Sequence, residues 1–304
     1  GLIFRLVASN ITPTGIKNMK ILILGNTGML GTYISAYGQQ TGNTILFPGS
    51  ANINRPDYLN PNSVLAEIER IKPDVVINCA AITSFERCEN FPDEAYQVNT
   101  LTPYNISNFC MEKGFYFIHI STDHYYIDAA NSAHSESDPV SVLNHYARTK
   151  FDAELKVLEN SNALVLRTSI IGRNKQNSSF LDWLINAINS NQKIDLFDDA
   201  FTSFIHCNEL APMIFNIMNS RPAGLYNLAS SEVFSKADFA VALAKRLKCS
   251  LNYALKSVET LSVKRANSCG LNSSKISTLC NVNLPNMLSS VEAAAIEWEK
   301  KSSI

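Results

Sequence analysis

The first half of the chain alternates short apolar runs with segments of helical periodicity, and few folds accommodate that rhythm. Each run is rich in β-branched residues and is long enough for one buried strand. A parallel sheet needs a crossover between successive strands, and helical segments between the runs supply it. The pattern therefore predicts a doubly wound α/β fold. The expected strands cover residues 20–24, 44–47, 74–79, 115–120 and 163–167.

Beyond residue 172 the expected elements become shorter and more mixed, which predicts a second, smaller mixed α/β domain. We expect an N-terminal extension over residues 1–19 and domains over 20–172 and 173–304. Helices are expected directly after the glycine-rich segment 25–31, over 62–71, 93–111, 146–158, 180–189, 209–218 and 236–248, and after Pro285, with a further strand over 225–228.

The composition indicates an ordinary globular protein. The 304 residues are 46% hydrophobic and 17% charged, and the formal net charge is −1. This balance gives no electrostatic reason to expect a nucleic acid or an anionic membrane as partner. The seven cysteines contain no C-x-x-C pair, so they suggest neither a disulfide framework nor a zinc site. We expect a cytoplasmic protein without a bound metal, and leave monomer and homodimer open.

Glycines recur with the spacing G-x-x-G-x-x-G directly after the first expected strand. Glycine there permits a tight turn and lets backbone N–H groups approach a pyrophosphate at the start of a helix. A strand-to-helix turn without any ligand is the alternative. The loop predicts dinucleotide contacts from Gly25, Thr27, Gly28, Met29, Leu30 and Gly31.

A second motif, Tyr146-x-x-x-Lys150, puts a phenol and an ammonium on one face of an expected helix. A nearby ammonium favours the phenolate and so brings the pKa of a tyrosine toward the working range. Thr122 follows the expected strand 115–120, at the carboxyl edge where open α/β sheets bind ligands. A surface Tyr/Lys pair and an ordinary turn residue are the alternatives. Together, the three residues predict an acid–base site acting on a carbonyl oxygen.

These motifs resemble those of the extended short-chain dehydrogenases/reductases, and more narrowly those of the dTDP-4-dehydrorhamnose reductase family. The matching stretches run in the family's order from residue 20 to about residue 300, and include residues 73–81, 94–99, 118–123, 166–169 and 264–268. The resemblance implies a Rossmann-type NAD(P)-binding domain followed by a mainly substrate-binding domain. It also implies reduction of the C4 keto group of a nucleotide-linked 4-keto-6-deoxy sugar, in polysaccharide biosynthesis.

The resemblance implies roles for individual residues as well. Thr122, Tyr146 and Lys150 would be the catalytic set, and the last two would also touch the cofactor. Asn99 would be either a helix-turn hydrogen bonder or a support for Lys150 through water. Asp57 and Tyr58 would border the adenine, Ala80, Ala81 and Ile82 would line the nicotinamide side, and Thr83, Asp123, Ile170 and Arg265 would contact the substrate, Arg265 at its pyrophosphate.

The choice of cofactor depends on the end of the second expected strand, where an acidic residue would bind the ribose 2′-OH and favour NAD. The stretch 48–56 contains no acid. The absence of an acidic residue there predicts NADPH as the cofactor, with Ser50 or Arg55 available to bind its 2′-phosphate. NADH is the alternative.

Two departures from the family fall where the sugar would bind. The segment Asp123-His124-Tyr125-Tyr126 differs from the commoner D-Y-V-F, and Ile170 stands where related reductases often carry tryptophan. They leave the identity of the sugar nucleotide open. An epimerase of the same superfamily and a non-catalytic NADP-binding subunit, like the methionine adenosyltransferase β subunit, are the rival functions. His124 replaces the second acid of the dehydratases' Thr-Asp-Glu, which argues against a dehydratase.

Three further residues near the motifs have ordinary interpretations. His119 and His124 are separated by an odd step along an extended segment, so they need not face one site. We expect a strand histidine and a loop histidine. Cys79 is expected to be a small apolar residue beneath the cofactor, without a role as nucleophile.

Overall fold

The computed structural model describes residues 18–48, 56–127 and 131–302. In the last of these ranges, the side chains of residues 300–302 are not described. The chain divides into two compact units. Unit 1 comprises Gly1–Thr122, Val142–Arg167 and Ala211–Tyr226; unit 2 comprises Asp123–Ser141, Thr168–Leu210 and Asn227–Ile304. This division is more complex than the single boundary predicted at residue 172, because a helix and a strand from beyond residue 210 return to unit 1. Within the described ranges, no helix is both long and apolar enough to cross a membrane.

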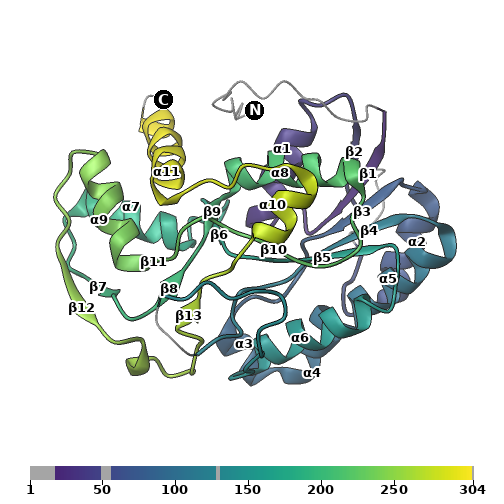
Figure 1. Ribbon diagram of the computed structural model, residues 1–304, viewed down its shortest axis with the longest axis horizontal. Coiled ribbons are helices and arrows are strands. Elements are labelled where there is room, and N and C mark those ends of the chain that lie inside the picture. Colours follow the sequence, from purple (N-terminus) through teal and green to yellow (C-terminus); the bar gives the residue numbers. More distant parts are fainter. Residues whose placement is uncertain (1–17, 49–55, 128–130, 303–304) are drawn as a thin grey trace. The chain divides into compact units, whose positions relative to one another are not determined.

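A six-stranded sheet forms the centre of unit 1 (Figure 1). The strands are β1 (Lys20–Leu24), β2 (Thr44–Leu46), β3 (Val75–Asn78), β4 (Tyr116–Ile120), β5 (Ala163–Thr168) and β10 (Gly224–Leu228). Their order is β10-β5-β4-β3-β1-β2, and the pairs from β5 to β2 are parallel. The predicted doubly wound class is confirmed. The strand that the sequence placed in the smaller domain, β10, instead forms an edge of this sheet.

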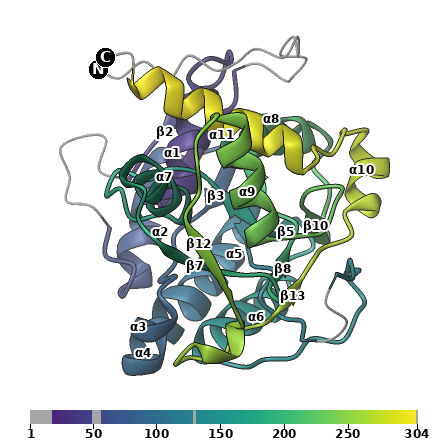
Figure 2. The same cartoon turned by 90° about the vertical axis from the view of Figure 1, so that its left-hand side faces the viewer.

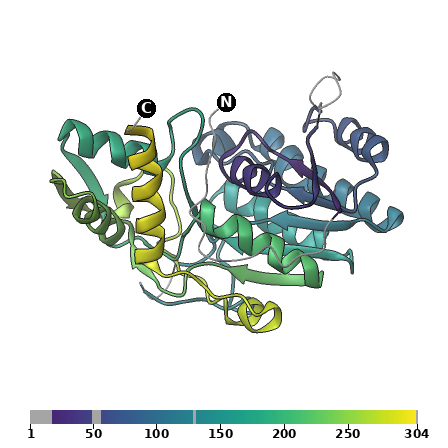
Figure 3. The ribbon, with the colours of Figure 1, turned by 90° about the horizontal axis from the view of Figure 1, so that it is seen from above.

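Helices cover both faces of the sheet, which explains why its inner strands are almost uniformly apolar. The helices are α1 (Met29–Gly38), α2 (Pro61–Ile71), α5 (Thr102–Lys113), α6 (His145–Val157) and α8 (Cys207–Ser220). On one face Ile68, Ile106 and Val157 bring α2, α5 and α6 into one core with the strands. On the other face lie α1 and α8 (Figure 3). The rings of Tyr37, on α1, and Phe215, on α8, are 5.2 Å apart.

The helix predicted over residues 93–111 is wrong as a single element. The segment divides into α4 (Pro92–Tyr96), the π-helical turn η1 (Gln97–Leu101) and α5. In η1 the N–H of Thr102 bonds to the carbonyl of Gln97, five residues earlier. Pro103 follows and has no N–H to donate, so the regular ladder cannot continue through it. A short helix that the sequence reading missed, α3 (Phe85–Asn90), starts at Ser84, whose hydroxyl accepts the N–H of Arg87.

Unit 2 packs its helices around an apolar core that includes Phe204 and Phe239, with ring centroids 4.8 Å apart. Its helices are α7 (Phe180–Ser190), α9 (Lys236–Arg246), α10 (Ser274–Cys280), α11 (Met287–Ser302) and the 3-10 turn η2 (Val258–Thr260). In Figure 2, α9 and α11 lie side by side. Its strands pair as β6 (Ile170–Ile171) with β9 (Ile205–His206), β7 (Ile194–Phe197) with β12 (Tyr253–Lys256), and β8 (Phe201–Thr202) with β11 (Phe234–Ser235) and β13 (Ser268–Cys269).

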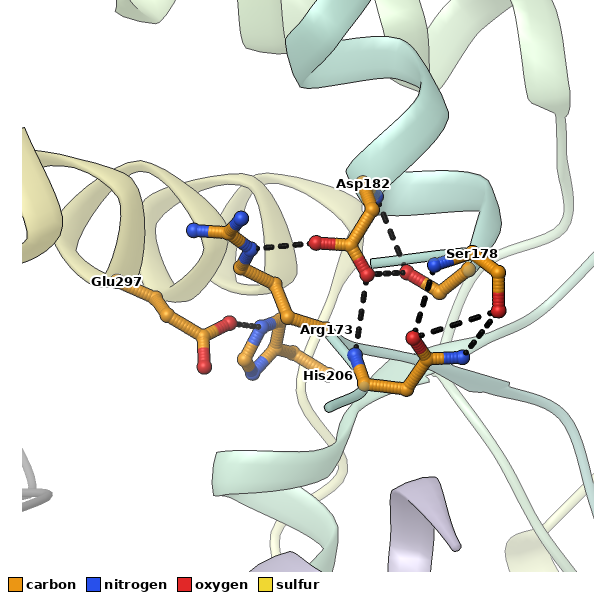
Figure 4. Close-up of polar contacts among 7 residues, drawn as sticks. Arg173, Ser178, Asp182, His206 and Glu297 are labelled. Carbon is orange, nitrogen blue, oxygen red and sulfur yellow. Dashed lines mark hydrogen bonds and ion pairs between the residues drawn. The ribbon is translucent and has the colours of Figure 1, made fainter. Parts of the chain in front are cut away.

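An ion pair and a hydrogen bond join separate segments of unit 2 (Figure 4). Arg173 Nε lies 2.6 Å from Asp182 Oδ1, at the start of α7. His206 Nε2 lies 3.2 Å from Glu297 Oε2, on α11. Removing Arg173 would leave the buried carboxylate of Asp182 without its counter-charge, which is costly. These contacts therefore specify how the loops of unit 2 attach to its helices.

The turn between β1 and α1 requires glycine at two positions. Gly25 has φ +77°, and a Cβ there would lie 2.6 Å from the backbone nitrogen of Ala80. At Gly31 a Cβ would lie 2.2 Å from the carbonyl oxygen of Gly25. A Cβ at Gly28 would lie 3.3 Å from the carbonyl oxygen of Gly25, and Gly28 has a φ of −73°. The third glycine is thus required for close packing of α1 against the loop, whereas the second tolerates a methyl group better.

We expect Gly31→Ala to lower the free energy of unfolding by about 3 kcal/mol, because the clashing atom is backbone and cannot rotate away. Gly28→Ala is the matched control and should cost less than about 1 kcal/mol. Urea unfolding of the ligand-free protein, followed by circular dichroism, measures both. Equal losses at the two positions would contradict the packing role of Gly31.

Candidate functional site

A cavity of about 430 Å³ lies in unit 1 beside the residues that follow β1 and β3. These strands are neighbours, yet the chain leaves β1 toward β2 on one side and reaches β3 on the other. Such a reversal is where open α/β sheets bind ligands. The cavity brings together many of the residues predicted to hold the cofactor: Gly25, Thr27, Gly28, Asp57, Tyr58, Ala80, Ala81 and Ile82.

A larger hollow of about 1250 Å³ lies in unit 2 beside α9 and α11. It contains none of the residues predicted to form the site. Its lining includes exposed apolar side chains such as Leu255 and Leu288. The smaller cavity of unit 1 is therefore the candidate site, because it combines the position at the sheet edge with the predicted residues.

The start of α1 suits an anion. Gly28 is the N-cap and supplies no capping side chain, and the first turn of this helix carries no acidic residue. Its backbone N–H groups and helix dipole therefore favour a phosphate group there. Met29, Leu30 and Gly31 form that first turn but do not line the cavity, so their predicted contacts depend on backbone N–H groups. The donor set thus fits the pyrophosphate of a dinucleotide.

The predicted adenine side is only partly described. Ser50 and Arg55 lie outside the described residues. The carboxylate of Asp57 accepts the N–H of Leu59 at 2.9 Å. The hydroxyl of Tyr58 accepts the N–H of Gly25 at 3.0 Å, which fixes the glycine loop. The sequence missed Arg87 and Glu94, which form an ion pair and also line the cavity. Glu94 begins the matching stretch 94–99, whereas Arg87 lies in none of the matching stretches.

Asn99, in the π-helical turn η1, holds the loop after β3. Its Oδ1 accepts the N–H of Ile82 at 2.8 Å, and its Nδ2 donates to the carbonyl of Ile82 at 3.0 Å. Nδ2 also donates to Thr149 Oγ1 on α6, at 3.0 Å. These contacts join the predicted nicotinamide side to the helix of Tyr146, and support of Lys150 through water stays a prediction. Thr83, next in the loop, is exposed and does not line the cavity.

The predicted catalytic side chains lie in unit 1, with Tyr146 and Lys150 on α6 and Thr122 just beyond β4. Tyr146 is 8% exposed and Lys150 is 3% exposed, so the alternative of a surface pair is wrong. The ring of Tyr146 packs on Phe85 of α3, with centroids 5.0 Å apart. Thr122 is also buried.

Burial controls the electrostatics around Lys150. It lowers the pKa of Lys150 to about 8, although Glu154 and Cys79 act in the opposite direction. Nζ donates to the carbonyl of Ile120 at 2.7 Å and lies 3.5 Å from His119 Nε2. Burial also raises the pKa of Cys79 to about 12, so its thiol stays protonated near neutral pH. That agrees with the expectation that Cys79 is not a nucleophile.

The sequence predicts an ordinary strand histidine at position 119, whereas the structure places its ring beside Lys150. One sequence feature could have indicated this contact. His119 is a polar residue within an otherwise apolar strand, two residues before Ser121. Its side chain is completely buried.

A buried ion pair holds α6 against the sheet. Arg167 of β5 contacts Glu154 through Nε, at 3.1 Å from both carboxylate oxygens, and through a second nitrogen at 2.7 Å. Ser121 donates to the same carboxylate at 2.5 Å. Glu154 lies one turn after Lys150, on the same face of α6.

The predicted substrate residues Asp123, Ile170 and Arg265 belong to unit 2. Burial lowers the pKa of His124; Lys236 and Arg265 add to this effect, and Asp123 opposes it. Unit 2 therefore brings Asp123 and Arg265 to the same histidine, together with Lys236, which the sequence reading did not select. Ile170 instead pairs with Ile205 between β6 and β9.

The tyrosines of the segment that departs from the family pattern have packing roles within unit 2. Tyr125 and Tyr126 are almost fully buried. Tyr126 stacks on His134, with ring centroids 4.1 Å apart. The difference at these positions thus alters the interior of unit 2.

Comparison with known proteins shows relatives that match most of the chain. A spore coat polysaccharide biosynthesis protein, SpsK of Bacillus subtilis, is 27% identical over 79% of this chain and 83% of its own. The dTDP-4-dehydrorhamnose reductase of Escherichia coli K12 is 28% identical over 73% of this chain and 76% of its own. Methionine adenosyltransferase 2 subunit beta of Pongo abelii is 27% identical over 90% of this chain and 86% of its own.

Solved structures share the fold. A dTDP-4-dehydrorhamnose reductase of Clostridium acetobutylicum matches with a TM-score of 0.83 at 23% identity, over 94% of this chain and all of its own. The enzyme of that name from Bacillus anthracis, crystallised in complex with NADP, matches with a TM-score of 0.83 at 21% identity, over 92% of this chain and 99% of its own.

The family model described as the RmlD substrate binding domain matches residues 19–299. It covers the glycine loop, the Tyr146-x-x-x-Lys150 motif and the residues of unit 2 discussed above. The chain therefore belongs to the RmlD substrate binding domain family.

Proposed function

We propose that this protein is an NADPH-dependent reductase that acts on the C4 keto group of a nucleotide-linked 4-keto-6-deoxy sugar. The observation that carries the proposal is the buried pair Tyr146 and Lys150 on α6, in the unit that holds the cavity with the glycine loop. Several relatives are named dTDP-4-dehydrorhamnose reductase, which supports this reaction class.

The proposed chemistry uses three side chains. When bound, NADPH supplies the hydride that adds to the carbonyl carbon. Tyr146 donates its hydroxyl proton to the carbonyl oxygen, and Thr122 donates a hydrogen bond to the same oxygen. The ammonium of Lys150 stabilises the phenolate that forms on Tyr146 and returns a proton to it. The carbonyl thus gains a hydride and a proton and becomes an alcohol.

The cofactor assignment is supported by the donor set at the start of α1 and by the acid-free stretch 48–56. The similar structure from Bacillus anthracis contains NADP. NADH is the second cofactor to test. In unit 2, Asp123 is proposed to contact the sugar, and Arg265 to bind the substrate's pyrophosphate through charge-assisted hydrogen bonds.

A non-catalytic subunit is the second candidate function, because the methionine adenosyltransferase subunit matches 90% of this chain. Retention of Thr122, Tyr146 and Lys150 favours the reductase. The two functions differ in turnover. We would follow NADPH oxidation with a panel of 4-keto-6-deoxy sugars linked to different nucleotides, starting with dTDP-4-dehydrorhamnose. Sustained oxidation with alcohol formation supports the reductase, sugar conversion without net oxidation indicates an epimerase, and no conversion of any substrate favours the binding subunit.

Replacing Tyr146 by phenylalanine should lower kcat by about 10³-fold and leave KM nearly unchanged, because only the proton donor is lost. Tyr104→Phe, on α5, is the matched control, since the Tyr104 ring lies 4.8 Å from Lys156 Nζ and outside the proposed site. Steady-state NADPH oxidation measures both. A Tyr146→Phe variant with wild-type kcat would exclude the proposed proton donor.

The pH dependence should show the titration of Lys150. Burial lowers the pKa of Lys150 to about 8, so the ammonium is present below that pH and is lost above it. The reaction needs the charged form, and kcat/KM should therefore fall on the alkaline side with a midpoint near pH 8. A profile of kcat/KM reports groups of the free enzyme and is the right measurement. A flat profile to pH 10 would contradict this assignment, 10 being about the ordinary lysine pKa.

A further inference from the structure

His119 lies in the interior of unit 1, and a nitrogen of a different side chain faces each of its two ring nitrogens. Its Nδ1 is 3.2 Å from Asn78 Nδ2, and its Nε2 is 3.5 Å from Lys150 Nζ. The ring is fully buried. Burial and the charge of Lys150 hold the pKa of His119 well below its ordinary value, so the ring is neutral. A neutral imidazole has one N–H donor and one ring nitrogen with a lone pair. Only one of the two neighbours can therefore donate a hydrogen bond to the ring.

A backbone hydrogen bond determines which neighbour donates to the ring. The N–H of Ala80 donates to Asn78 Oδ1 at 3.1 Å, and a backbone N–H can only donate. The amide oxygen of Asn78 is therefore turned toward Ala80, and its NH₂ group toward the histidine. Nδ1 of His119 must accept from that NH₂ group, which places the ring's proton on Nε2. The Nε2–H then faces Lys150.

We propose that His119 is a positioning residue whose Nε2–H opposes the ammonium of Lys150 and provides a hydrogen bond to the neutral amine. An N–H group repels an ammonium, which has no lone pair, but donates to an amine, which has one. The lysine is thus held ready to release a proton and to recover it. This inference rests on the proposed function, because it describes how Lys150 would reprotonate Tyr146.

The remaining groups around Lys150 fit this arrangement. The carbonyl of Ile120 accepts from Nζ at 2.7 Å and keeps the amine in place in either protonation state. Glu154 favours the charged form, but its carboxylate is bound to Arg167 and Ser121. The thiol of Cys79 stays protonated near neutral pH because burial raises its pKa to about 12. His119 is thereby the neighbour whose proton position distinguishes the two states of the lysine.

The first test reads the tautomer directly in the ligand-free wild-type protein. Nitrogen NMR of selectively ¹⁵N-histidine-labelled protein distinguishes a protonated ring nitrogen from one with a lone pair. We assign the His119 signals by their loss in His119→Phe or, if that variant does not fold, in His119→Gln. We expect the proton on Nε2 and the lone pair on Nδ1. A proton on Nδ1, or on both nitrogens near neutral pH, would overturn the proposal.

The second test measures the titration of Lys150 through its ¹³Cε resonance, again without ligand. In His119→Phe the Nε2–H is gone, so the midpoint should rise by about one pH unit, which equals the loss of about one hydrogen bond. His119→Gln restores an N–H donor and should move the midpoint back toward the wild-type value. His145→Phe, at an exposed position on the same helix, is the matched control and should leave the midpoint unchanged.

The kinetic counterpart is a matching upward shift of the alkaline limb of kcat/KM in His119→Phe. An unchanged or lowered Lys150 midpoint in His119→Phe, or no restoration by His119→Gln, would refute the inference. Both NMR measurements are made without substrate. Failure of the reductase proposal, seen as no turnover with any keto sugar nucleotide, is therefore distinguishable from failure of the role given to His119.

Discussion

The contact between Glu154 and Arg167 determines the placement of the predicted catalytic helix. Both side chains are almost completely buried, and charges removed from water are tolerated only with full pairing. Arg167 is fixed in β5, so the carboxylate determines how α6 is rotated about its axis. Tyr146, Lys150 and Glu154 follow one another at four-residue steps and share one stripe of the helix. Anchoring the last member of the stripe turns the other two inward, where burial lowers the pKa of Lys150.

The candidate site is assembled from segments that are far apart in the sequence, and hydrogen bonds to backbone groups hold them. Tyr58 fixes the glycine loop, and Asn99 fixes the loop at Ile82 while also contacting α6. Both partners in each of these contacts belong to the protein itself. A site whose loops are held in advance loses less conformational entropy when a ligand binds. The π-helical turn that carries Asn99 is part of this arrangement, and such turns are common at functional sites.

The sequence was sufficient for features with a strong local signal. The first five strands and the motif from Tyr146 to Lys150 were found because apolar runs and helical spacing mark them directly. The two-residue strands of unit 2 were not found, since so few residues show no periodicity. The interruption at Gln97–Leu101 depends on the missing N–H of Pro103 together with tertiary contacts to Asn99. The role of His119 was also hidden, because it depends on Asn78 and Lys150, which reach it from other elements.

The edge strand β10 has a consequence for how the protein is made. During synthesis from the N-terminus, β5 emerges long before Gly224, and the chain passes through part of unit 2 in between. Over that interval the outer edge of β5 presents unpaired backbone groups, which can pair with another chain. Unit 1 completes its sheet only when β10 arrives beside β5. A nascent chain stalled within unit 2 would therefore expose an unpaired strand edge that can pair with other chains, and it would be a natural substrate for chaperones.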